Sequence, residues 1–236
     1  MEWLENWFPN VLAYWDKFME SCVATLQMFL IGGGISLLIG FFFGVVLVIT
    51  RPGGIRENRP VYRAFNFFIN TFRSVPIIIL LIFLIPFTRL LMGTAIGVKG
   101  AVVPLCFGCV PFFTRQVETA LSTVDPGKVE AARAMGSGTA GIVLRVYLHE
   151  AVPNLIRVIT ITAISLIGLT TMAGAVGAGG IGSFAINYGQ NLHHQDIVNV
   201  CVILLLIIVS IMQTAGSTLA ARTTNRALFR KGGNTK

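Results

Sequence analysis

Three long runs without a single charged residue limit what this chain can fold into more than any other feature. They hold 30, 38 and 25 residues. An apolar run of roughly 18 residues or more is typical of a membrane-spanning helix. The three runs are Ser21–Thr50, Val158–Gln195 and Ile197–Ala221. They predict an integral membrane protein.

The composition agrees with a membrane protein and excludes two other classes. Only 12% of the 236 residues are charged, whereas soluble domains carry about 25%. The mean hydropathy of +0.76 also excludes an intrinsically disordered chain, which needs low hydrophobicity and high charge. A chain of this length has room for about five or six spans of about 20 residues.

Two shorter uncharged runs, at 74–88 and 100–114, lie between the first and second long runs. Each becomes long enough to cross a membrane when its flanking residues are included, and transmembrane helices tolerate the prolines that they contain. The segment 176–195, rich in Gly, Asn, Gln and His, is expected to be a partly re-entrant loop. The five predicted spans are Ser21–Thr50, Phe65–Phe87, Gly97–Gln116, Asn154–Ala175 and Ile197–Leu219.

The basic residues predict on which side of the membrane each loop lies. With Arg73 of span two left aside, fourteen Lys and Arg residues fall in the loops at 51–63 and 115–157 and in the tail after 221. Only three fall in the alternate segments. Basic residues are retained on the cytoplasmic side. We therefore expect the N-terminus outside and the C-terminus in the cytoplasm.

The net charge of +8 also raises the question of nucleic-acid binding. Because the membrane topology explains where the basic residues lie, we expect no nucleic-acid partner.

The four cysteines lie in apolar stretches, so we expect buried thiols and no disulfide framework or zinc site. The first twenty residues hold four acidic residues and one lysine, unlike the basic start of a signal peptide, so we expect the first span to stay uncleaved.

Gly40 and Gly44 form a G-x-x-x-G pattern in span one. Small residues at this spacing let two helices approach closely in a membrane. The pattern fits packing within one chain, and a dimer seam is the alternative.

The predicted cytoplasmic loop between spans three and four has the pattern of two short helices. Asp125 and Pro126 suit the N-cap and first position of a helix. The residues that follow favour helix, and Gly136 suits its end. Thr139 suits the cap of a second helix, with apolar residues at helical spacing as far as Leu148.

The first of these helices has the features of a knob that docks into a groove on a soluble partner. Its small alanine side chains let another surface come close, and the glycine after them lets the chain turn sharply. A solvated connector without a partner is the alternative that this shape leaves open. The residues expected at the docking surface are Glu130, Ala131, Ala132, Ala134 and Gly136.

This loop carries a resemblance to a known family. Glu130–Ala132, then Gly136, Leu148 and Pro153, resemble the EAA loop of ABC importer permeases, in which it is the coupling helix. One departure is His149, where the family often has proline. The resemblance covers residues 25–213. Within the family, the chain is most similar to methionine-importing permeases. The segments that carry it are Thr50–Gly53, Phe72–Pro76, Ile85–Arg89 and Gly174–Gly180.

The resemblance implies an assembly around this chain. It implies a homodimer of permease subunits in lipid, two cytoplasmic ATPase subunits that bind ATP and Mg²⁺, and a substrate-binding lipoprotein on the outer side. The implied substrate is L-methionine, with D-methionine or close analogues as a further option. This chain has no Walker A motif, so we expect it to bind no cofactor or metal itself and to catalyse no reaction.

The end of span four is predicted to line the translocation path or its gate. Met172 matches the family at this position, with ordinary packing of a flexible side chain as the alternative. Thr170 and Thr171 are neighbours on the same helix, and glycines allow the non-helical backbone that is tolerated where it lines a cavity. The predicted path residues are Met172, Thr171, Gly174 and Gly177.

Three other motifs are weaker. Gly177–Gly182 matches the dinucleotide fingerprint G-x-G-x-x-G, but a predicted membrane helix precedes it where the fingerprint needs a strand. His193 and His194 have no third ligand for a metal site. Arg73, a charge near the membrane boundary, is a candidate for contact with lipid headgroups or the ATPase, and less so with a substrate carboxylate.

These observations predict an all-α integral membrane protein of the bacterial cytoplasmic (inner) membrane, with five spans and a coupling helix between spans three and four. The expected division is a periplasmic segment at 1–20, a permease domain at 21–221 and a basic cytoplasmic tail at 222–236. A related ABC permease for another amino acid is the alternative within the class. An ion-coupled carrier or a channel is the alternative outside it.

Overall fold

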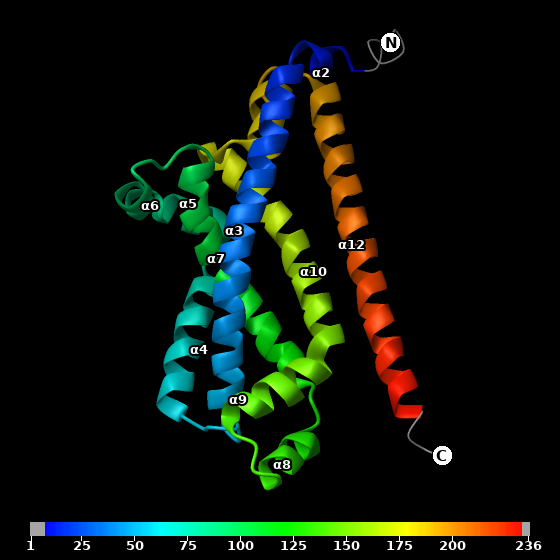
Figure 1. Cartoon of the computed structure of the whole chain (residues 1–236). Coiled ribbons are helices and arrows are strands. Elements are labelled where there is room, and N and C mark those ends of the chain that lie inside the picture. Colours follow the sequence, from blue (N-terminus) through cyan, green and yellow to red (C-terminus); the bar gives the residue numbers. More distant parts are fainter. Residues whose placement is uncertain (1–7, 233–236) are drawn as a thin grey trace. The chain divides into compact units, whose positions relative to one another are not determined.

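The computed structural model describes residues 8–232, with side chains described as far as Thr224. All regular elements in this range are helices (Figure 1). The chain divides into two compact units, each assembled from three separate segments. Unit 1 contains Met1–Ser36, Ser74–Cys109 and Ala163–Ile211, and unit 2 contains Leu37–Arg73, Val110–Thr162 and Met212–Lys236.

Four helices in the described range are long and apolar enough to cross a bilayer, and each contributes to both units. They confirm predicted spans one, three, four and five as helices. Each extends past its predicted bounds, because helices continue into polar segments that an uncharged-run criterion excludes. The four are α3 (Trp15–Thr50), α7 (Gly97–Ser122), α10 (Leu148–Ala173) and α12 (Gln195–Gly232).

The second span predicted over Phe65–Phe87, with Pro76 and Pro86 as tolerated kinks, is broken into separate helices. The segment forms three separate helices, and the first two count as a span only as a broken pair. Pro76 lacks an N–H and disfavours helical geometry in the residue before it, so the first helix ends before Val75. The three helices are α4 (Arg59–Ser74), α5 (Ile77–Phe83) and α6 (Ile85–Met92).

In unit 2, the second half of α3 packs closely on the second half of α7. A Cβ placed on Gly44 would lie 2.6 Å from the Cβ of Val117, so only glycine permits this approach. A Cβ on Gly40 would lie 2.9 Å from Phe113. The G-x-x-x-G pattern therefore serves packing within the chain.

The core of unit 2 brings the predicted coupling loop together with the long helices. The loop forms α8 (Pro126–Ala134), α9 (Thr139–Ile142) and the π-helical segment η1 (Val143–Tyr147). Burying apolar side chains from the loop and from the long helices in one cluster anchors the loop to its unit. The buried members are Val48, Phe113, Val117, Ala120, Leu121, Val124, Val129, Ala132, Ile142, Tyr147, Ala151 and Val158.

Two expectations about the second loop helix are corrected. Gly138, not Thr139, is the N-cap, and Thr139 is the first helical residue. The helix also does not stop before span four, because residues 139–178 form one continuous candidate span. His149 has the N–H that proline lacks, so the helix passes through the position where the family often has proline. Pro153 lies inside α10.

Unit 1 contains two further apolar clusters, one around Met28, Leu105 and Leu166 and one around Phe18, Phe184 and Ile197. Its remaining elements are short. They are α2 (Pro9–Ala13), the π-helical segment η2 (Gly174–Ala178), α11 (Gly180–Phe184) and the π-helical segment η3 (Ala185–Gln190). The predicted loop at 176–195 is therefore largely made of short helices joined at a glycine kink. Residues 1–7 of the predicted periplasmic segment and residues 233–236 of the predicted cytoplasmic tail lie outside the described residues.

Candidate coupling site and glycine kink

Helix α8 begins and ends as its sequence predicts. The Asp125 carboxylate accepts a hydrogen bond from the Gly127 N–H at 2.9 Å, and Pro126 occupies the first turn. At the other end Gly136 has φ +78°. Its N–H bonds to the Arg133 carbonyl at 2.9 Å, and the Ser137 N–H to the Ala132 carbonyl at 3.0 Å. This Schellman pattern satisfies the last carbonyls of α8 and reverses the chain.

The two faces of α8 divide the predicted coupling residues. Glu130, Ala131 and Ala134 are exposed, as is Gly136 beyond them. Ala132 is only 5% exposed and packs into the core with Val129. It therefore anchors the buried face of α8. Met135 is 78% exposed, and the sequence interpretation did not single it out. An exposed large apolar side chain beside small alanines suits a protein contact.

Two ionic side chains fix α8 to the rest of unit 2. Lys128 forms an ion pair with Glu150 at the start of α10. Arg133 donates to the carbonyl of Ile55, in the segment between α3 and α4. Both bonds join residues far apart in sequence, and for that reason the linear pattern did not indicate them. They hold α8 at two points on opposite sides of its buried face.

A polar network between α4 and α7 in unit 2 was also missed. Glu118 is 8% exposed and pairs with Arg115. The Tyr62 hydroxyl donates to Glu118 at 3.3 Å, and Arg115 also donates to Asn66. A buried carboxylate needs such partners to offset its lost hydration. The network attaches the amphipathic helix α4 to α7. The sequence shows four polar residues on α4 and α7 but not that they meet.

The predicted non-helical backbone occurs at the glycine kink, the segment 174–180 between α10 and α11. Val176 has φ −105° and ψ 21°, and Gly177 has φ +92°. Gly179 and Gly180 have φ values of +80° and +79°, which residues with a Cβ rarely adopt. Three left-handed residues in four positions turn the chain from α10 into α11.

The kink brings the end of α10 against α11 through glycine contacts. A Cβ on Gly182 would collide with the backbone carbonyl of Thr171, and a Cβ on Gly174 would lie 2.5 Å from the Ser183 nitrogen. Backbone atoms cannot swing aside as side chains do. Gly182, which the sequence interpretation treated only as part of a rejected fingerprint, is therefore required for packing.

A buried hydroxyl on α3 fixes the start of α11. The Thr25 Oγ1 accepts a hydrogen bond from the Ile181 N–H at 2.8 Å and donates to the Ser21 carbonyl at 3.0 Å. Thr25 is 6% exposed, so both bonds are shielded from water. A Cβ on Gly180 would lie 2.6 Å from the same oxygen. Thr25 thus holds a segment 156 residues away in the chain.

The predicted path residues are neighbours at this kink, and they differ in exposure. Met172 is 42% exposed, while Gly174 is buried. The Thr171 hydroxyl donates to the Ile167 carbonyl within its own helix. A groove of about 760 Å³ lies in unit 1 beside Ala178–Gly180, and none of the four predicted residues lines it. Its polar lining comes mainly from Lys17, Glu20, Ser21, Gln27, Ser183 and Asn187.

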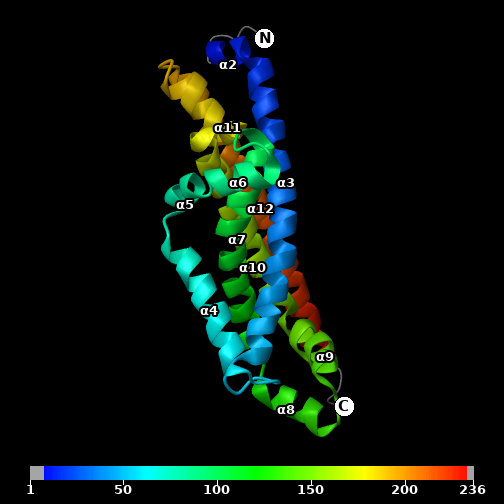
Figure 2. The same cartoon turned by 90° about the vertical axis from the view of Figure 1, so that its left-hand side faces the viewer.

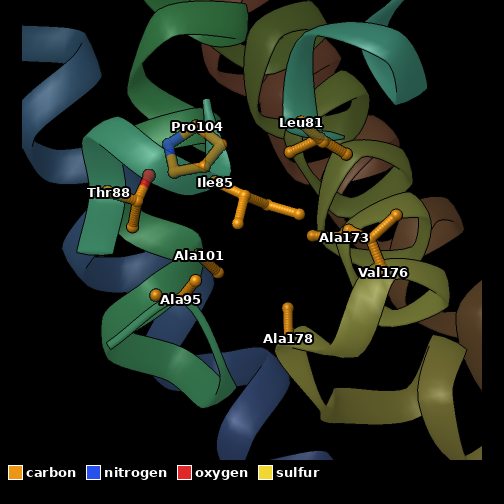
Figure 3. A pocket seen from close by; sticks show the side chains of 10 residues that line it. Leu81, Ile85, Thr88, Ala95, Ala101, Pro104, Ala173, Val176 and Ala178 are labelled. Carbon is orange, nitrogen blue, oxygen red and sulfur yellow. The ribbon is translucent and has the colours of Figure 1, made fainter. Parts of the chain in front are cut away.

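A much smaller cavity of about 20 Å³ lies among α5, α6, α7 and the kink (Figure 3). Its lining includes Thr88, whose hydroxyl is buried without a hydrogen-bond partner and points toward Pro104 (Figure 3). Because Pro104 has no N–H, the Gly100 carbonyl receives no helical bond from it. The cavity has room for about one water molecule. It is too small for an amino acid.

The remaining motifs form neither a metal-ligand cluster nor a disulfide in the described part of the chain. There, no three His, Cys, Asp or Glu residues gather as metal ligands. The four cysteines are free thiols. The G-x-G-x-x-G match follows a helix, so it lacks the strand that a dinucleotide site requires. Arg73 is exposed in the last turn of α4, and its contact with lipid or with an ATPase stays a prediction.

These features define a helical membrane permease whose helix–glycine–helix loop is the candidate coupling site. Residues 36–226 match the family described as the inner membrane component of binding-protein-dependent transport systems. The chain belongs to this family and is a multi-pass protein of the bacterial inner membrane. Large apolar side chains on its long helices, such as Leu38 at 77% and Ile211 at 63% exposure, suit contact with lipid or another subunit.

Methionine-transport permeases are similar to this chain over most of its length. The methionine import system permease protein MetP of Bacillus subtilis is 40% identical over 214 residues, which cover 90% of this chain and 95% of MetP. The D-methionine permease MetI of Escherichia coli K12 is 47% identical over 150 residues, 64% of this chain and 69% of MetI. A chain of the inward-facing MetNI methionine ABC transporter is 42% identical, with a TM-score of 0.85 over 88% of this chain and 96% of its own length.

Proposed function

We propose that this chain is the permease subunit of an ATP-driven methionine importer and forms the path across the membrane by alternating access. One observation carries the proposal. The chain shares 42% identity and a TM-score of 0.85 with the MetNI permease chain, over 88% of its own length. At this similarity the fold is shared, which supports the same class of transport.

The chemistry of ATP hydrolysis belongs to a separate subunit in this proposal. Two ATPase subunits bind ATP and Mg²⁺ on the cytoplasmic side, and the permease supplies the surface that they move. The exposed face of α8 suits this role, because Glu130, Ala131 and Ala134 face outward while Val129 and Ala132 anchor the helix. The N-terminus lies outside and the C-terminus inside, as the basic residues favour.

The translocation path is proposed to pass the glycine kink in a homodimer of this subunit. A substrate-binding lipoprotein delivers methionine on the outer side. Met172, Thr171, Gly174 and Gly177 are the residues at the kink proposed to act as path or gate. Left-handed glycines permit the backbone to change direction without strain, and such backbone in a membrane protein suits a cavity wall.

The proposal is tested by uptake of labelled methionine into proteoliposomes containing the permease, its ATPase and its binding lipoprotein. ATP inside the vesicles should drive uptake, and vesicles with ADP are the control. Competition by L-methionine, D-methionine and unrelated amino acids separates the substrates. Uptake competed equally by another amino acid would make the chain a related permease. Uptake driven by an ion gradient without ATP would make it a carrier.

A further inference from the structure

The segment between α3 and α4, residues 51–58, is a compact loop. The Gly54 N–H bonds to the Arg51 carbonyl at 2.8 Å, and the Asn58 N–H to the Thr50 carbonyl at 3.0 Å. The Glu57 carboxylate accepts from the Gly53 N–H at 3.0 Å. These hydrogen bonds within the segment give the loop a defined shape.

This loop is joined to the coupling helix. Arg133 of α8 donates to the Ile55 carbonyl, and the Ile55 side chain packs on the apolar cluster that holds Val129 and Ala132. The Arg51 guanidinium donates to the Ser122 hydroxyl at 2.5 Å, close to the start of α8. Figures 1 and 2 both show the loop lying next to α8. The loop and α8 therefore share one surface of unit 2.

The outer side of the loop is exposed and carries positive charge. Pro52, Gly53 and Arg56 are exposed, and so is the Glu57–Arg59 pair. The Glu57 carboxylate lies 2.7 Å from Arg59, which offsets its charge. Arg56 then leaves the loop with a net positive surface beside the exposed face of α8.

We propose that the loop at 51–58 is a second docking contact for the ATPase subunit, with Arg56 meeting an acidic patch on that partner. The inference rests on the proposed function, because it extends the docking face of α8. Continuity with that face selects the ATPase, since a subunit seated on Ala131, Ala134 and Met135 would cover the neighbouring loop as well. The positive charge of Arg56 favours a partner surface of opposite charge. The Arg133–Ile55 bond then transmits movement of α8 to the end of α3.

A photo-crosslinking residue at Pro52 tests the contact directly in the complex of full-length permease with its ATPase. The expected product is a crosslink between the two subunits. The same residue at Leu90, which is 83% exposed on α6 of unit 1, is the matched control and should give none. A crosslink to lipid alone from Pro52 would overturn the inference.

The charge is tested by Arg56→Glu, with Arg157→Glu on α10 as a control for the same change of charge. We expect Arg56→Glu to weaken association with the ATPase about tenfold. It should also flatten the loss of affinity as salt rises, because less charge attraction remains for salt to screen. Equal association of both variants with the ATPase would overturn the inference, as would a defect of Arg56→Glu only toward vesicles of phosphatidylglycerol.

A third variant separates this inference from the proposed function. Met135→Asp places a charge on the exposed face of α8, and association with the ATPase should fall if that face docks at all. Loss with Met135→Asp but not with Arg56→Glu would leave the importer standing and remove the second contact. Normal association of both variants with the ATPase would remove both the docking role of α8 and the second contact. Melting temperature of the purified permease checks that each variant is folded.

Discussion

Gly136 follows the end of α8 and Gly182 lies inside α11, and the two glycines have different surroundings. A Cβ on Gly136 would meet nothing within 4 Å, and only its φ of +78° calls for glycine. A Cβ on Gly182 would collide with the Thr171 carbonyl, although its own backbone is an ordinary helix. One glycine serves the conformation of its own residue. The other serves contact between two helices.

The difference separates an exposed lobe from a packed kink. The α8 lobe in unit 2 is built from local signals and presents its residues outward, which suits a docking surface. The kink in unit 1 is built from contacts between distant segments, including Thr25 with Ile181. Substitutions in the lobe should therefore impair coupling while the protein stays folded, and substitutions in the kink should lower stability first.

The largest loss of stability is expected for Gly182→Ala. The added methyl overlaps backbone atoms of Thr171 that cannot rotate away, and such overpacking costs about 3 kcal/mol. Thermal unfolding of the purified permease in detergent measures it. Gly168→Ala, where the helix has open space around the Cβ position, is the matched control and should be neutral or slightly stabilising. Equal melting temperatures of the two variants would contradict the contact.

A smaller loss is expected for Thr25→Val, which keeps the shape of the side chain but removes the hydroxyl. The buried Ile181 N–H then has no acceptor, at a cost of about 1–3 kcal/mol. Thr25→Ser keeps the hydroxyl and should recover most of the stability. Unfolding curves and methionine uptake are measured for both. A serine variant as unstable as the valine variant would assign the effect to packing alone.

Gly136→Val should cost about 1–2 kcal/mol, because a β-branched residue resists the left-handed conformation. The effect on transport is expected to be larger than that on folding, since the turn that presents α8 is lost. ATP hydrolysis should continue while uptake of methionine stops. Gly136→Asn, which tolerates this conformation, should retain uptake. Normal uptake of methionine with Gly136→Val would contradict a role of this turn in coupling.

The smallest effect is expected for Glu57→Gln in the loop at 51–58. The Gly53 N–H and Arg59 hold the pKa of the Glu57 carboxyl below its ordinary value of 4.5. A lowered pKa in the folded state means that the ionised form adds stability above the unfolded pKa, and that this is lost as pH falls through the folded value. The two proteins should therefore differ slightly in melting temperature at pH 6 and converge as pH falls through the lowered pKa of Glu57. A difference that persisted in acid would contradict this origin.

The parts of the fold that the sequence predicts correctly are those set by local rules. Uncharged runs indicate the long helices because a bilayer excludes charge. Asp125, Pro126 and Gly136 mark both ends of α8, since capping and left-handed turns depend on a few adjacent residues. The break near Pro76 follows a local rule too. The prediction places Pro76 as a kink inside one second span, whereas the structure ends one helix there and begins another.

The candidate site is divided in the same way. The exposed face of α8 could be predicted from Glu130–Ala132 and Gly136, but not that Ala132 faces inward. The pairing of Arg133 with Ile55, of Glu118 with Arg115 and Tyr62, and the groove beside Ala178–Gly180 had no signal in the linear pattern. Each depends on which helix faces which.

The sequence by itself determined that this protein lies in a membrane, where its long helices run and how α8 begins and ends. These follow from solvation and from backbone geometry within a few residues. Only the tertiary structure decided that Gly182 must be a glycine, that Thr25 holds α11 and that the loop at 51–58 joins α8. Close packing depends on residues that are distant along the chain, and a hydrogen bond has meaning only when its partner is known.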